Sequence, residues 1–233
     1  MRNGNSKLSK DKFVSSRGSK QKIKKSKRKE SSRRWISRQL NDPYVSEAQK
    51  RGFRSRAAFK LLQIDERYSL FKDGMNIVDL GCAPGGWLQV ISKIINKKKT
   101  GKLIGIDLLE TDALPDVEIL VGDISNKVTF DEMINRLEGK KVNGVVSDMA
   151  ADTTGHRPTD HIRTTMLLEE ALNIAIEILC KGGFFLGKCF KGGAENEVLK
   201  RLNDNFKTVK HVKPDASRKE SIETYVLGLE FKK

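Results

Sequence analysis

Two charged side chains in the second half of the chain stand where apolar segments would bury them. Lys188 lies within the apolar run FFLGKCF, and Asp148 directly follows the apolar run GVVS. Burying an unpaired ammonium is costly, so a lysine in such a run is usually paired with an acid or kept deprotonated for use. Both residues are therefore candidates for proton-transfer chemistry, with a helix or turn cap as the structural alternative for Asp148.

A glycine-rich turn and three acids predict a second kind of site. Residues 76–87, NIVDLGCAPGGW, describe an apolar strand containing Asp79, a turn and the start of a helix. Asp107 and Asp123 close the next two predicted strands, where carboxylates can accept hydrogen bonds from ribose hydroxyls and an adenine amino group. Such acids often only cap the next helix, but together the three favour an adenosine ligand. Ala83 replaces the second glycine of the dinucleotide fingerprint, which argues against a nicotinamide-dependent dehydrogenase.

These side chains can meet only if the strands that carry them end on the same side of one sheet. Apolar patterning predicts seven strands, at residues 76–80, 102–108, 117–122, 142–149, 184–190, 207–212 and 223–231. Helices are predicted between them at residues 86–95, 130–137, 160–179 and 194–203. Thr129 and Glu132 are placed as a capping box for the second of these helices. The alternation predicts an α/β fold with a mostly parallel, doubly wound sheet, whose last two strands are antiparallel neighbours.

The chain before this sheet is strongly basic. Residues 1–30 hold twelve Lys or Arg and two acids with few apolar residues, which predicts a disordered basic tail before one domain at 31–233. Two helices are expected, at about 43–51 and 57–68. Basic and aromatic residues alternate around them and predict an RNA-docking face with steep salt dependence, although a solvated helical surface is the simpler alternative. The residues of this face are Arg34, Lys50, Arg51, Arg54 and Arg56, with Trp35, Tyr44 and Phe53.

Other features narrow the class of protein. The three cysteines and three histidines are scattered without metal-ligand spacing, so we expect no metal site. No apolar stretch approaches membrane-spanning length, and no signal-peptide core is present. We therefore expect a cytoplasmic protein that does not bind membranes, and a monomer.

Five short runs resemble the motifs of the FtsJ/RrmJ family of S-adenosylmethionine-dependent RNA 2'-O-methyltransferases. They are GFRSRAAFK at 52–60, VDLGCAPGGW at 78–87, SDMA at 147–150, GKCF at 187–190 and VKPDASRKESIETY at 212–225. Within the family the runs are most similar to the bacterial RlmE type, which methylates a uridine ribose in 23S ribosomal RNA. The resemblance implies a Rossmann-like methyltransferase fold, S-adenosyl-L-methionine as cofactor, and ribosomal RNA or the 50S subunit as partner.

The resemblance also implies site residues. The family's catalytic positions fall on Lys60, Asp148, Lys188 and Glu223, and its cofactor contacts fall on Gly85, Trp87, Asp107, Asp123 and Asp148. We hypothesise that Lys188 is the general base, that Asp148 and Lys60 tune it, and that Glu223 positions the group. One departure is visible after Asp148, where Ala151 and Asp152 replace the family's usual Pro-Asn.

Two other functions stay open at this point. A tRNA 2'-O-methyltransferase would share the catalytic residues and differ in what its basic face recognises. A non-catalytic RNA-binding factor in ribosome assembly would keep the fold, but the complete set of four charged residues argues against it. Met149-Ala150 after Asp148 differs from the Pro-Pro-aromatic run of amino-methylating enzymes, which favours a ribose oxygen as methyl acceptor.

Overall fold

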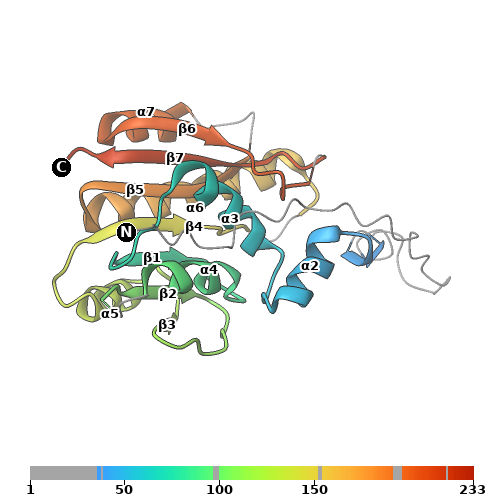
Figure 1. Cartoon of the computed structure of the whole chain (residues 1–233). Helices are drawn as coiled ribbons and strands as arrows, with labels where there is room; N and C mark the ends of the chain where they lie inside the picture. Colours follow the sequence, from blue (N-terminus) through green and yellow to red (C-terminus); the bar gives the residue numbers. More distant parts are fainter. Residues whose placement is uncertain (1–35, 38, 97–99, 152–153, 191–195, 219) are drawn as a thin grey trace, which may run out of the picture.

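A seven-stranded sheet with helices on both faces forms the centre of the molecule (Figure 1). The computed structural model describes residues 36–37, 39–96, 100–151, 154–190, 196–218 and 220–233. The predicted tail at 1–30, together with Arg34 and Trp35, lies outside the described residues. No helix in the described part of the chain is long and apolar enough to cross a membrane.

The strands run in the order β3-β2-β1-β4-β5-β7-β6. Their bounds are β1 Ile77–Leu80, β2 Leu103–Asp107, β3 Glu118–Val121, β4 Val142–Ser147, β5 Leu179–Phe190, β6 Phe206–Val212 and β7 Glu223–Phe231. Strands β1 to β5 pair in parallel, whereas β7 is antiparallel to both β5 and β6. The predicted mostly parallel, doubly wound sheet with an antiparallel last strand is therefore confirmed.

Two layers of helices cover the sheet. One face carries α2 Pro43–Arg51, α3 Ala57–Tyr68 and α4 Gly86–Ile95, and the other carries α5 Lys127–Arg136, α6 Arg157–Ile178 and α7 Asn196–Asn205. Side chains alternate between the layers along each strand: Val146 and Leu186 pack toward α3 and α4, and Val145 and Phe185 toward α6. This alternation explains why the buried strands are almost continuously apolar.

Two local predictions were wrong. Helix α5 begins at Lys127 rather than residue 130, because the Asn126 side chain already accepts a hydrogen bond from the Val128 backbone nitrogen and caps the helix there. Thr129 thus lies inside the first turn and forms no capping box with Glu132. Strand β5 begins at residue 179, directly after α6, and not at 184, because Leu179 already pairs with Val142 before an irregularity in the register.

The register of three strands brings charged residues to one end of the sheet. Ser147, the last residue of β4, pairs with Gly187 of β5. Asp148 and Lys188 are the next residues of the two parallel segments, so they lie side by side. The antiparallel β7 enters from the opposite direction, with Glu223 opposite Phe190. Parallel pairing alone would have sent the start of β7 to the far end of the sheet, so the reversed strand is what places Glu223 here.

Candidate active site

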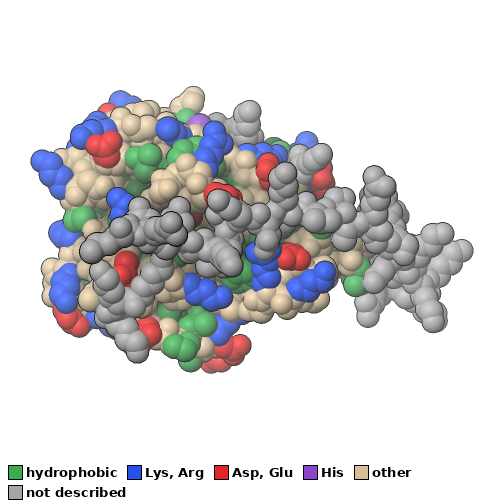
Figure 2. Space-filling view, viewed as in Figure 1, with side chains coloured by type: hydrophobic (Ala, Val, Ile, Leu, Met, Phe, Trp, Pro, Cys, Tyr) green, Lys and Arg blue, Asp and Glu red, His purple; other side chains and the backbone are tan. Residues whose placement is uncertain are grey.

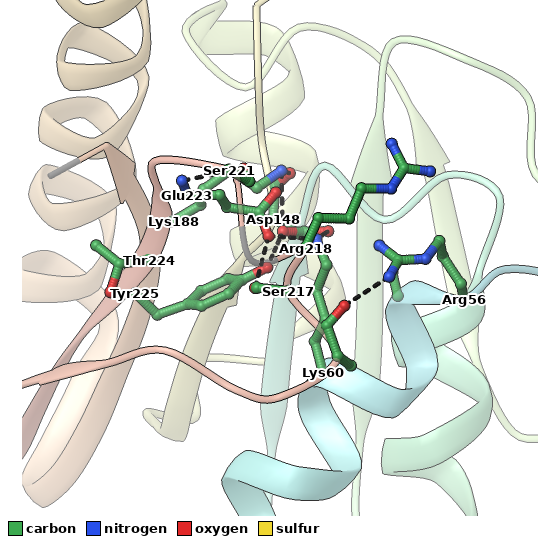
Figure 3. Close-up of polar contacts among 12 residues, drawn as sticks. Arg56, Lys60, Asp148, Lys188, Ser217, Arg218, Ser221, Glu223, Thr224 and Tyr225 are labelled. Atoms are coloured by element: carbon green, nitrogen blue, oxygen red, sulfur yellow. Dashed lines mark hydrogen bonds and ion pairs between the residues drawn. The ribbon is translucent and has the colours of Figure 1, made fainter. Parts of the chain in front are cut away.

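Four charged side chains from four segments meet at the carboxyl ends of β4 and β5 (Figure 3). Lys188 Nζ lies 2.9 Å from Asp148 Oδ1. Lys60 Nζ, from helix α3, lies 2.7 Å from Glu223 Oε1 and 3.9 Å from Asp148 Oδ2. The lysine side chains are each 8% exposed, and the acid side chains 17% and 18%. The structure therefore brings together all four sequence-predicted catalytic candidates in a mostly buried cluster.

Asp148 is the centre of this cluster. Its Oδ1 also accepts a hydrogen bond of 2.6 Å from the Tyr225 hydroxyl, and its backbone oxygen accepts one of 2.6 Å from Lys188 Nζ. Lys60 Nζ lies 5.8 Å from the centre of the Tyr225 ring. Lys188 is thus held by both the side chain and the backbone of one residue, which fixes the direction of its ammonium group.

Charge and burial act in opposite directions on Asp148. Burial alone would raise the pKa of its carboxyl group, but Lys60, Lys188 and the Tyr225 hydrogen bond together hold that pKa below its usual value. The pKa of Tyr225 is raised well above its usual value by burial and by the neighbouring carboxylates of Asp148 and Glu223. At neutral pH the cluster therefore contains an ionised Asp148 and a protonated Tyr225 that donates to it.

Tyr225 and Ser217 belong to the site but were not among the predicted site residues. Tyr225 stands two residues after Glu223, and residues two apart on a strand share a face, so period-two spacing could have indicated it. Ser217 is buried, and its hydroxyl donates a hydrogen bond of 3.0 Å to Glu223 Oε1. No sequence signal marks Ser217, because its role depends on how the loop before β7 folds back.

A cavity of about 300 Å³ lies beside the charged cluster. Three of the predicted cofactor-binding acids, Asp107, Asp123 and Asp148, border it. Glu170 of α6 is a further acid in the wall. The rest of the wall is apolar or glycine and consists of Gly81, Ala83, Ile106, Leu108, Leu109, Gly122, Ile124, Met149, Ala150 and Leu167. A wall with apolar surfaces and a few carboxylates suits a nucleoside, whose base is flat and whose hydroxyls and amino group donate hydrogen bonds.

Asp107 and Asp123 border this cavity while also shaping their own turns. Asp107 Oδ2 accepts from the Ala83 backbone nitrogen at 2.8 Å, and its Oδ1 accepts from the Leu109 backbone nitrogen at 2.9 Å. Asp123 Oδ1 accepts from the backbone and the hydroxyl of Ser125, and these hydrogen bonds lower its pKa. Both interpretations of these strand-end acids, capping and ligand binding, are therefore compatible. Each carboxylate is oriented by hydrogen bonds to its own turn, and each still borders the cavity.

Asp79 differs from the other acids because it is fully buried in β1. Neither of its carboxylate oxygens has a hydrogen-bond partner among the described residues. Burial raises its pKa well above the usual value, and the nearby charges of Asp148 and Asp107 raise it further. Asp79 is thus an unpartnered buried carboxyl group two residues before the glycine turn, and such a group in a folded protein calls for an explanation.

Gly85 and Trp87 lie at the turn, but they are not among the described residues that line the cavity. Gly85 has φ +100°, a conformation that favours glycine, and a Cβ there would lie 2.6 Å from Nη1 of Arg54 and would displace the end of that side chain. The Trp87 indole nitrogen donates to the Ala57 backbone oxygen at 2.9 Å, and its ring centre lies 5.7 Å from that of Tyr225. Trp87 therefore joins the glycine turn to helix α3 and to the charged cluster.

Comparisons with known proteins agree with this geometry. The model of the FtsJ-like methyltransferase family matches residues 53–231. The chain belongs to the FtsJ-like methyltransferase family. Relatives named ribosomal RNA large subunit methyltransferase E include one from Bartonella bacilliformis, 52% identical over 88% of this chain and 85% of the relative, and one from Brucella anthropi, 51% identical over the same shares.

A solved structure is also similar. A Plasmodium falciparum protein described as a ribosomal RNA methyltransferase shares 30% identity and a TM-score of 0.70, over 77% of this chain and 98% of that chain. The sheet order and the single antiparallel strand described above are thus the Rossmann-like methyltransferase fold that the FtsJ resemblance implied.

Several residues of the predicted docking face serve contacts inside this FtsJ-like domain. The Arg54 guanidinium donates to the backbone oxygens of Asp112 and Ala113, at 2.7 Å and 3.0 Å. Phe53 is buried in the core, so it does not contribute an exposed ring for stacking on a base. Lysine and arginine side chains remain visible over α2 and the adjoining surface, with acids among them (Figure 2).

Proposed function

We propose that this chain transfers a methyl group from S-adenosyl-L-methionine to the ribose 2'-hydroxyl of a uridine in 23S ribosomal RNA. The observation that carries the proposal is the buried cluster of Lys60, Asp148, Lys188 and Glu223 at the edge of a carboxylate-lined cavity, in an FtsJ-like domain. The names of the relatives at about half identity support the large ribosomal subunit as the source of the RNA.

The cavity fits an adenosine-bearing cofactor. Asp107 would accept from the ribose hydroxyls and Asp123 from the adenine amino group, with apolar side chains such as Ile106 and Leu108 against the base. We place the methionine part of the cofactor toward the turn that contains Gly85 and Trp87, which follows the strand carrying the unpartnered carboxyl group of Asp79. When bound, S-adenosyl-L-methionine supplies a methyl group on a positively charged sulfur.

Lys188 is the proposed proton acceptor for the attacking 2'-hydroxyl. Its nitrogen is fixed by two contacts with Asp148, so a deprotonated Lys188 would present its lone pair in a defined direction. The Lys60 ammonium lies 3.9 Å from Asp148 Oδ2, so both lysines contact the same carboxylate. Glu223 Oε1 lies 2.7 Å from Lys60 Nζ, and this ion pair positions the Lys60 ammonium group.

The RNA would approach across the face that carries α2 and α3. The chain has a formal net charge of +15, which favours binding to a polyanion and makes that binding sensitive to salt. The basic segment at 1–30 adds to this attraction in our proposal, while 31–233 forms the methyltransferase domain. Basic residues without base-specific contacts position RNA without reading its sequence, so selection of the target uridine needs the shape of the rRNA as well.

Labelled methyl transfer tests this function. The protein is incubated with labelled S-adenosyl-L-methionine and either total RNA, purified tRNA, 30S particles or 50S particles from cells that lack the enzyme, and the modified ribose is mapped. We expect label on a uridine 2'-oxygen in 23S RNA, and a rate of labelling lower by roughly a hundredfold or more when the Lys188→Ala variant is used. Label only in tRNA would replace the substrate proposal, and no label in any fraction would favour the non-catalytic RNA-binding alternative.

A further inference from the structure

A buried acid outside the charged cluster joins the two segments that carry Lys60 and Glu223. Asp42 precedes helix α2, and its side chain is 6% exposed. Its Oδ1 accepts a hydrogen bond of 3.1 Å from the Tyr44 backbone nitrogen, which caps α2. The other oxygen faces two arginines: Arg56 Nε lies 2.9 Å away, and Arg218 Nε donates to it at 3.3 Å. One carboxylate thus holds residues from three segments.

The two arginines belong to the segments that matter for the active site. Arg56 directly precedes helix α3, one turn before Lys60, whereas Arg218 lies in the loop that leads to Glu223. Figure 3 shows both arginines extending beside Lys60. Two further contacts fasten the same loop to α3: Arg56 donates to the Ala216 backbone oxygen at 2.6 Å, and the Ala216 backbone nitrogen donates to Gln63 Oε1 at 2.7 Å.

These contacts bear directly on the Lys60–Glu223 pair. Lys60 is on a helix packed against the sheet, and Glu223 is the first residue of a strand inside it, so no shared backbone ladder fixes their separation. The loop at 213–218 also supplies Ser217, whose hydroxyl donates to the same Glu223 oxygen that contacts Lys60. A shift of this loop relative to α3 would therefore withdraw the Ser217 hydroxyl from the Glu223 oxygen that contacts Lys60, and would disturb the Lys60–Glu223 pair.

We propose that Asp42 is a positioning residue for methyl transfer, and that it holds the 213–218 loop against α3 through Arg56 and Arg218. The inference rests on the proposed function, because it assigns a kinetic role to a contact outside the charged cluster. Asp42 is not among the described residues that line the cavity. Replacing it should therefore change turnover and not cofactor affinity. Ion pairs of a buried carboxylate with two arginines restrain geometry more than exposed pairs do, since water screens them less.

Asp42→Asn separates the two tasks of this side chain. Asparagine caps helices as well as aspartate does and keeps the acceptor for Tyr44, but it removes the negative charge that faces Arg56 and Arg218. We expect kcat to fall by about tenfold to a hundredfold, the scale for a misplaced catalytic group. The affinity for S-adenosyl-L-methionine should stay within about twofold of the parent. Glu47→Gln is the matched control, because it removes the charge of a half-buried pair with Arg51 on the same helix, away from the 213–218 loop, and should change neither value.

A double variant tests whether the contacts act as one unit. Arg218→Met alone should lower kcat as Asp42→Asn does, and the combination should cost little more than either change alone. Additive losses would overturn the shared role. An unchanged kcat in Asp42→Asn, or an equal loss of cofactor affinity together with a lowered melting temperature, would overturn the positioning role.

Hydrogen exchange distinguishes this inference from the proposed function. Backbone amides in 213–218 should exchange faster in Asp42→Asn than in the parent, and at the parent rate in Glu47→Gln. This readout needs no methyl acceptor, so it reports on the loop even if the parent protein methylates none of the RNAs tried. Unchanged exchange in Asp42→Asn would overturn the proposed restraint itself.

Discussion

The cavity and the charged cluster are neighbours that share Asp148, yet the chain builds them in different ways. The cavity uses the turns after successive strands, where Asp107 and Asp123 accept hydrogen bonds from residues only two positions further on. The charged cluster instead joins a helix before the sheet with the start of the last strand, through Lys60 and Glu223. Asp107 and Asp123 in the first region are also held by contacts two residues away, whereas the second region depends on contacts between segments far apart in the sequence.

This difference has an electrostatic counterpart. In the cluster each charge has an opposite charge within 4 Å, and the pKa of Asp148 is lowered as a result. On the cavity side Asp79 has no hydrogen-bond partner among the described residues, and its pKa is raised. The charged cluster is thus satisfied by its own ion pairs, whereas the Asp79 carboxyl group is not.

The largest expected effect separates the two regions by function. Lys188→Ala removes the proposed proton acceptor and should lower kcat by roughly a hundredfold to ten-thousandfold. Because Lys188 does not border the cavity, the dissociation constant for S-adenosyl-L-methionine should change little. Single-turnover methyl transfer and calorimetric binding of the cofactor measure the two quantities.

Lys181→Ala is the control for this prediction, since Lys181 lies on the same strand but is exposed. It should match the parent in both measurements. Near-normal turnover in Lys188→Ala would remove this residue from the mechanism and would leave the charged cluster without an assigned base.

A smaller effect should appear on the cofactor side alone. Asp123→Asn keeps an oxygen for Ser125 but replaces the second carboxylate oxygen with a donor. Loss of one hydrogen bond of about 1 kcal/mol should weaken cofactor binding by roughly fivefold, with kcat at saturating cofactor unchanged. Titration of the cofactor without RNA measures the affinity.

Asp116→Asn serves as the comparison for Asp123→Asn. Asp116 has φ +59°, a conformation that asparagine tolerates, and it does not border the cavity. A fall in kcat for Asp123→Asn, with unchanged cofactor affinity, would mean that the two regions are not separable in the way proposed.

A third effect concerns the stability of the unliganded protein, and it is separate from kcat and cofactor affinity. The folded-state pKa of Asp79 is raised, so the folded protein binds a proton there that the unfolded chain has released above about pH 4. The parent should therefore lose stability as pH rises from this value toward the raised pKa, by at most about 1.4 kcal/mol per pH unit. Asp79→Asn has no titrating group at this position. Its unfolding free energy should therefore rise relative to that of the parent as the pH increases over the same interval.

Urea unfolding at a series of pH values measures this difference. A parallel dependence in parent and variant would show that Asp79 titrates alike in the folded and unfolded chains. Excess S-adenosyl-L-methionine provides a second comparison, because it should stabilise the parent more than the variant if the buried carboxyl group receives a donor from the bound cofactor.

Sequence reasoning was most successful where a signal is local. The strand that contains Asp79, the turn after it and the acids at the next strand ends follow from apolar runs and turn chemistry over a few residues. It was less successful at boundaries: the cap of α5 at Asn126 and the start of β5 at Leu179 depend on which of several suitable residues the rest of the fold selects. Phe53 was assigned to a surface because its basic neighbours suggested one, but packing against Phe59 and the core places it inside.

The sequence by itself determined the fold class, the end of the sheet where Asp107, Asp123 and Asp148 gather and the burial of Lys188, because strand periodicity and turn residues act over short distances. For Lys60 and Glu223 the residues alone left an ordinary surface charge as an equal possibility, and only resemblance to a family selected them. The tertiary structure decided that they form a pair 2.7 Å apart, with Tyr225 against Asp148. The physical reason is that their meeting depends on the antiparallel register of β7 and on the packing of α3 against the sheet, which no short stretch of sequence encodes.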